Sequence, residues 1–113
     1  MLLKINGYIE ITAGVLLLIL PFLSVSFPGM EIITEPGPMF PTMYGAAAMS
    51  LGALSLALGS SILNTSVTKR VHFIFAIFHT LLAINQFYFN PMIAVGILHG
   101  GLAIAFWVSL IRK

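Results

Sequence analysis

Apolar residues gather in four runs along the chain, each close to the length that a helix needs to cross a bilayer. The runs cover roughly residues 2–23, 43–63, 71–89 and 92–111. About 20 apolar residues in a helix span a hydrocarbon core of about 30 Å. Polar turns at Asn64–Arg70 and Asn90-Pro91 separate the later runs. The pattern predicts an all-α protein, an integral-membrane up-down four-helix bundle that forms one transmembrane domain over residues 1–113.

Proline and charge predict the topology of this bundle. Residues 24–42 form a Pro-rich loop that contains Glu31 and Glu35 and no Lys or Arg. All five basic residues fall on the opposite side of a four-span protein. They are Lys4, Lys69, Arg70, Arg112 and Lys113. By the positive-inside rule, we expect both termini to be cytoplasmic and the loop to lie outside the cell membrane.

Composition supports the bilayer as the solvent of this chain. Of its 113 residues, 59% are hydrophobic and 7% are charged, whereas a soluble domain has about 25% charged residues. The basic residues lie at predicted membrane edges, so they indicate contact with lipid headgroups and no role in nucleic-acid binding. Cysteine is absent, which excludes disulfides, thiol catalysis and Cys-ligated metal centres.

The third run carries a polar and small stripe on one helical face. Its members recur at steps of three and four residues, and they are His72, Ala76, His79, Ala83 and Gln86. A lipid-facing surface would not hold two histidines and a glutamine, because unpaired polar groups are costly in hydrocarbon. We therefore expect this stripe to face protein or a water-lined cavity.

Small residues form comparable stripes on the other helices. The second run has Gly45, Ala48, Gly52, Ser55 and Gly59, and the fourth has Gly96, His99, Gly100 and Ala103. Small residues let helix backbones approach closely in lipid. We therefore expect Gly45, Gly52, Gly59, Gly96 and Gly100 to pack against neighbouring helices. Small residues left on second faces would suit a homo-oligomer or a larger membrane complex.

Helix geometry predicts that three ionisable residues meet inside the bundle. At about 1.5 Å per residue, His79 lies ~13 Å from Arg70 and His99 lies ~12 Å from Pro91, so both fall near the midplane. Glu10 lies about one helical turn from the level of His79. Glu10, His79 and His99, with Asn6, His72 and Gln86 nearby, are our candidates for binding a ligand or carrying a proton.

Each of these residues also has a purely structural interpretation. Glu10 is close enough to the interface to pair with Lys4 or Asn6, and His72 is close enough to be an interfacial histidine. His79 and His99 would each be satisfied by a carbonyl on a neighbouring helix. We predict no catalytic residue, no metal site and no cofactor. Haem b held by His79 and His99 is a minor alternative, because facing histidines at equal depth are its usual ligands.

Two families of small four-span membrane proteins resemble this chain. The Gly/Ala-rich stretch Tyr44–Gly52 and the overall length are similar to DoxX-like proteins, which implies a quinone-related or respiratory accessory role. The chain also resembles the small multidrug resistance family in its length and in one membrane glutamate, Glu10. That likeness implies exchange of protons for lipophilic cations. The third run departs from the latter family's pattern, because it contains no glycine.

These observations favour a membrane protein, not an enzyme, in which a Glu/His cluster binds or transports a small lipophilic or protonatable ligand. The main alternative is an accessory or structural subunit of a larger membrane complex, in which the polar faces contact partner helices. A haem- or quinone-linked redox protein is the second alternative.

Overall fold

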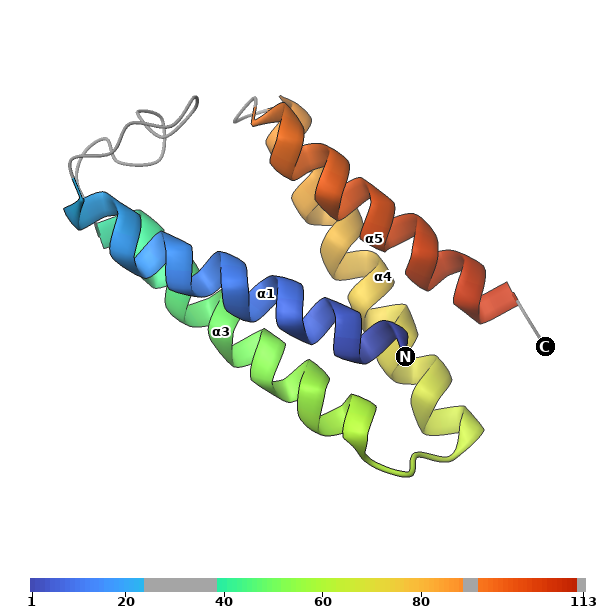
Figure 1. Ribbon diagram of the computed structural model, residues 1–113. Coiled ribbons are helices and arrows are strands. Elements are labelled where there is room, and N and C mark those ends of the chain that lie inside the picture. Colours follow the sequence, from blue (N-terminus) through green and yellow to red (C-terminus); the bar gives the residue numbers. More distant parts are fainter. Residues whose placement is uncertain (24–38, 89–91, 112–113) are drawn as a thin grey trace. The chain divides into compact units, whose positions relative to one another are not determined.

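The computed structural model describes residues 1–23, 39–88 and 92–111, and the described residues are helical apart from short connections. The helices are α1 (Leu2–Ile19), α3 (Met39–Ser60), α4 (Thr65–Tyr88) and α5 (Ile93–Ile111), and α1 continues into a short 3₁₀ helix, η1 (Leu20–Phe22) (Figure 1). With η1 counted into the first, all four are long and apolar enough to cross a membrane. The all-α prediction is confirmed in this part of the chain.

Two helices begin earlier than the hydrophobic runs indicate. Helix α3 starts at Met39, within the predicted loop, and takes Pro41 into its first turn. Proline is tolerated there, because the first N–H groups of a helix have no partner within the helix. The Thr42 hydroxyl also donates a hydrogen bond to the Met39 carbonyl over 2.9 Å. The rest of the predicted loop, 24–38, and the Asn90-Pro91 turn lie outside the described residues.

Helix α4 begins at Thr65, so the predicted polar turn Asn64–Arg70 is wrong over most of its length. Asn64 caps the helix: its Oδ1 accepts a hydrogen bond of 2.8 Å from the Val67 N–H. Asparagine is among the best N-cap residues, because its short side chain satisfies an orphan N–H. The polar residues after the cap are therefore the first turns of α4, and Lys69 and Arg70 are helical.

The chain divides into two compact units, the first containing α1 and α3 and the second containing α4 and α5. In the first unit α1 and α3 run antiparallel with their backbones in close contact. A Cβ atom added at Gly14 would lie 2.6 Å from the Gly45 carbonyl oxygen, and one at Gly52 would lie 2.8 Å from that of Gly7. Only glycine permits this approach, which recurs every seven residues along each helix.

The second unit is an antiparallel pair whose interface is filled by aromatic rings. Phe75 of α4 stacks on Phe106 of α5 with ring centroids 5.4 Å apart, and Phe73 meets Trp107 edge to face at 5.8 Å. A Cβ at Gly96 would lie 2.9 Å from the Phe87 ring. Large side chains on one helix thus fill the space that small residues leave on the other.

That Gly100 packs against another helix stays a prediction. A Cβ added there would meet no heavy atom within 4 Å among the described residues, and the same holds for Gly101.

The glycine contacts of the first unit can be tested by adding one methyl group. We expect Gly52→Ala to destabilise the protein by about 1–3 kcal/mol, because the new Cβ would overlap backbone atoms that cannot rotate away. Gly101→Ala is the matched control, since its Cβ would enter open space and alanine favours the helix. Thermal unfolding in mild detergent measures both. Equal stability of the two variants would contradict the close α1–α3 packing.

The cap of α4 predicts a local effect. Asn64→Ala should cost about 0.5–2 kcal/mol, because the Val67 N–H loses its acceptor. Asn64→Ser, which keeps a capping oxygen, should retain most of this stability. Hydrogen exchange of the first turn of α4 reports the change directly. Unaltered protection in Asn64→Ala would show that the cap does not hold this end of the helix.

Candidate functional site

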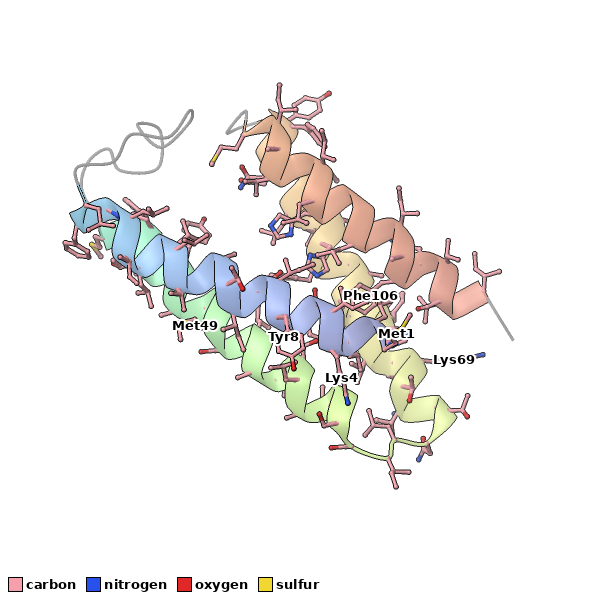
Figure 2. The ribbon with its side chains drawn as sticks, in the orientation of Figure 1. Met1, Lys4, Tyr8, Met49, Lys69 and Phe106 are labelled. Atoms are coloured by element: carbon pink, nitrogen blue, oxygen red, sulfur yellow. The ribbon has the colours of Figure 1, made fainter. Side chains whose placement is uncertain are left out.

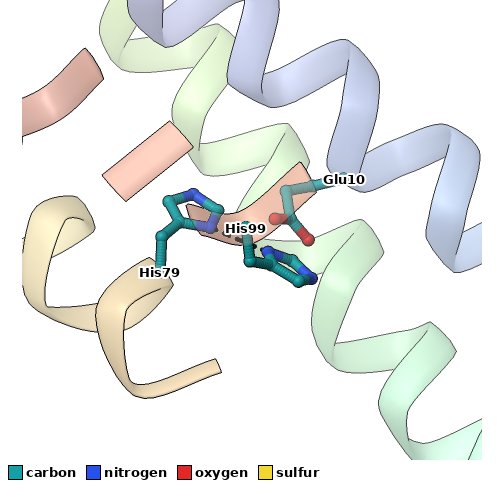
Figure 3. Close-up of side chains that lie close together, drawn as sticks. All are labelled: Glu10, His79 and His99. Carbon is teal, nitrogen blue, oxygen red and sulfur yellow. Dashed lines mark hydrogen bonds between the residues drawn. The ribbon is translucent and has the colours of Figure 1, made fainter. Parts of the chain in front are cut away.

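The centre of the α4–α5 unit contains a hydrogen-bonded pair of imidazoles. The Nδ1 atoms of His79 and His99 lie 3.0 Å apart, and the ring centroids are 5.2 Å apart with planes inclined at 23°. Figure 3 shows the two rings facing each other with this bond between them. This contact agrees with the prediction that the two histidines lie at matching depth on facing helices. We call the two residues the His79–His99 pair.

Aromatic rings fix the orientation of His79. Its ring stacks on Phe106 at a centroid distance of 5.7 Å with an interplanar angle of 10°, and Phe78 meets it edge-on at 5.1 Å. Both His79 and Phe106 are fully buried, whereas His99 keeps part of its surface exposed. Stacking of this kind leaves an imidazole few alternative rotamers. His79 is thus the fixed member of the pair and His99 the accessible one.

The shared bond limits which protons the pair can carry. Between two neutral imidazoles, one Nδ1–H donates and the other Nδ1 accepts. The donor ring then has a lone pair on Nε2, and the acceptor ring has a hydrogen there. One added proton can occupy that lone pair without breaking the bond, while a second would place hydrogens on both facing nitrogens. The pair is therefore chemically suited to exchange a single proton or to bind a group with one donor and one acceptor.

His72 forms a separate contact on the same face of α4. Its Nδ1 lies 2.8 Å from the Ser109 hydroxyl, which itself donates to the Phe106 carbonyl over 2.6 Å. Because a hydroxyl has one hydrogen, His72 must donate its Nδ1–H to Ser109. The Phe106 ring contacts both His72 and His79. An apolar ring between the two histidines interrupts the stripe, which opposes a continuous proton path from His72 to His79.

Two further polar side chains complete the inner face of α4. Thr80 donates to the Ala76 carbonyl of its own helix over 2.7 Å and accepts a bond of 3.1 Å from the Trp107 indole N–H. The Gln86 Oε1 atom is buried and has no hydrogen-bond donor among the residues that the structure describes. Among the described residues, no hydrogen bond of Gln86 Oε1 therefore connects Gln86 to His79 or His99.

The candidate residues of α1 belong to the other unit. Asn6 donates from Nδ2 to the Ser55 hydroxyl over 3.2 Å, and Ser55 donates to the Leu3 carbonyl over 2.8 Å. Asn6 therefore contributes a hydrogen bond between α1 and α3. Glu10 lies on the same buried face of α1 as Asn6 and Gly14. That Glu10 joins the two histidines stays a prediction.

Sequence reasoning missed Ser109 as the partner of His72 and Thr80 as the partner of Trp107. A signal for the first was present, because the antiparallel register that places residue 79 opposite 99 also brings residue 72 near residue 106 and its neighbours. No signal identified Trp107, because a tryptophan near a helix end is usual at a membrane interface.

The bonds of Ser55 provide a test of the polar contact between α1 and α3. Ser55→Ala should destabilise the protein by about 0.5–2 kcal/mol, since it removes a partner of Asn6 and of the Leu3 carbonyl. Ser50→Ala is the matched control in the same helix, because among the described residues the Ser50 hydroxyl bonds only the Ala46 carbonyl one turn away. Thermal unfolding in detergent should separate the two. Similar unfolding temperatures would contradict a stabilising role for Ser55.

Comparison with known proteins gives no family for this chain. No protein-family model, no curated protein and no solved structure matches it. Function must therefore be argued from the site itself.

Proposed function

We propose that this is a multi-pass membrane protein that binds a small lipophilic molecule able to donate, accept or exchange one proton. The observation that carries the proposal is the direct bond between His79 and His99 in the middle of two helices able to span a membrane. Imidazole is the side chain that changes its charge most readily near neutral pH. A pair of imidazoles, one of them accessible, is suited to binding such a ligand or moving it across the bilayer.

The same geometry argues against a purely structural role in which the two histidines only hold α4 and α5 together. Serine, threonine or asparagine would also hold two helices together by hydrogen bonds, as Asn6 and Ser55 do in the other unit. Two imidazoles add a capacity to exchange protons that such a contact does not need. The exposed part of His99 gives a ligand access to the pair.

The remaining parts of the proposal rest on the sequence. The distribution of Lys and Arg supports cytoplasmic termini in the cell membrane. The depth of Glu10 along α1 supports its action as a third proton-binding group. Ligand binding and transport would both be non-enzymatic functions. Haem or quinone binding stays a minor alternative. For haem ligation through these nitrogens, the bond between the two imidazoles would first have to break.

A second candidate function is that of an accessory subunit. The observation in its favour is the open space beside Gly100 and Gly101 on α5, since small residues with open sides are suited to close contact with another transmembrane helix. Such a subunit would co-purify with stoichiometric partner proteins in mild detergent.

Replacing both imidazoles by phenyl rings tests ligand binding. His79→Phe/His99→Phe keeps two stacking rings but removes every nitrogen, so we expect the helices to remain folded while ligand binding is lost. Native mass spectrometry from mild detergent measures retained small molecules and added probes. We would use tetraphenylphosphonium as a lipophilic cation, quinacrine as a protonatable amine and decylubiquinone as a hydrogen-bond acceptor.

The matched control is His72→Phe, which removes the third histidine but leaves the His79–His99 pair intact. Wild type and this control should bind the same probe, and the double variant should bind it at least tenfold more weakly. Binding that is unchanged in the double variant would refute the proposed site. Absence of any bound molecule or probe, together with a stoichiometric partner protein, would establish the accessory role instead.

A further inference from the structure

A shallow apolar groove opens between α4 and α5 at the end of the hairpin that contains Lys69. It has a volume of about 500 Å³ and is lined by Lys69, Arg70, Phe73, Ile74 and Leu110. Its surface is almost entirely apolar, although two of its five lining residues are cations. The groove is therefore a shallow hydrophobic surface with two basic residues in its lining.

The charge around this groove has one sign. No Asp or Glu occurs anywhere after Glu35, whereas this half of the chain contains Lys69, Arg70, Arg112 and Lys113. An anion near the groove thus meets no carboxylate of its own helices. Arg112 and Lys113 follow Leu110 closely in the sequence.

The order of residues along α4 separates charge from hydrocarbon. Lys69 and Arg70 lie in the early turns of the helix, and Phe73 and Ile74 lie ~6 Å further along it. Figure 2 shows the Lys69 side chain extending away from the α4 ribbon. Long basic side chains near a helix end keep their charge at the headgroup level while apolar neighbours face the acyl chains.

We propose that this groove is a binding site for an anionic membrane phospholipid. Lys69 and Arg70 bind the phosphate and its headgroup, and one acyl chain lies along Phe73, Ile74 and Leu110. Both halves of the ligand match the site: the cations complement the anion, and the apolar lining complements the chain. A soluble anion matches only the first half, and a zwitterionic lipid lacks the net charge. The occupant is thus a lipid of the cytoplasmic leaflet and not a free phosphate.

Competition between matched lipids tests this site. We would load the full-length protein in dodecyl maltoside with equimolar phosphatidylglycerol and phosphatidylcholine of identical chains, and count adducts by native mass spectrometry. Phosphatidylglycerol should be retained preferentially. Each membrane-surface cation contributes about 1 kcal/mol to the binding of anionic lipid, which corresponds to roughly a fivefold change in affinity. Lys69→Gln/Arg70→Gln should therefore weaken retention by about 30-fold.

Two further variants separate the proposed site from general attraction. Lys4→Gln removes one basic charge from α1, a helix that supplies no residue to the groove lining, and should leave retention within about twofold. Ile74→Trp keeps all charges but fills the groove, so it should weaken binding of phosphatidylglycerol while leaving that of glycerol phosphate unchanged. Circular dichroism confirms that each variant remains helical.

Several outcomes would overturn the proposal. These are equal retention of the two lipids, unchanged retention in Lys69→Gln/Arg70→Gln, or an equal loss in Lys4→Gln. Glycerol phosphate that binds as tightly as the lipid would show an anion site without an acyl groove. None of these readouts depends on the His79–His99 pair, so the test of the lipid site is independent of the test of the proposed function.

Discussion

The described helices are long and apolar enough to cross a membrane, and the cost of an unpaired polar group in such surroundings is the constraint that best accounts for their contacts. Water is absent from the bilayer core, so a polar side chain in a spanning helix needs a partner within the protein. Three pairs of side chains in the described helices meet this need by hydrogen bonds across a hairpin. Asn6 bonds Ser55, His79 bonds His99, and His72 bonds Ser109. Each pair fixes the register of two helices that general apolar contact would leave free to slide.

The two hairpins solve the packing problem in opposite ways. In α1 and α3, glycines bring the backbones together, and the carbonyl oxygen of one helix lies where a side chain of the other would begin. In α4 and α5, stacked rings such as Phe75 and Phe106 hold the helices apart and fill the space between them. The first arrangement leaves no room for a ligand between its helices. The second provides rigid aromatic walls, which suit a site that must hold two imidazoles in fixed orientation.

The α4–α5 hairpin therefore combines two kinds of chemistry at two levels. The His79–His99 pair lies in the middle of the helices and is suited to proton exchange with a lipophilic molecule. The basic groove around Lys69 and Arg70 lies at the helix ends and is suited to an anionic headgroup. Phe106 and the bond between His72 and Ser109 lie between these levels. The proposed lipid site and the proposed ligand site therefore lie in one hairpin without sharing a residue.

The sequence alone determined the class of fold and the facing histidines. Long apolar runs separated by polar residues indicate membrane-length helices. The few residues between the third and fourth runs predict that these two helices are antiparallel neighbours, so the equal depth of His79 and His99 follows from helix rise. The sequence pattern places the beginnings of α3 and α4 too late, because proline and asparagine are common in loops, although Pro41 is suited to a first helical turn and Asn64 to an N-cap. The partner of His72 and the open side of Gly100 required the tertiary structure. Periodicity identifies the face on which a residue lies, but the size of the side chains on the opposing helix decides how closely that face is approached.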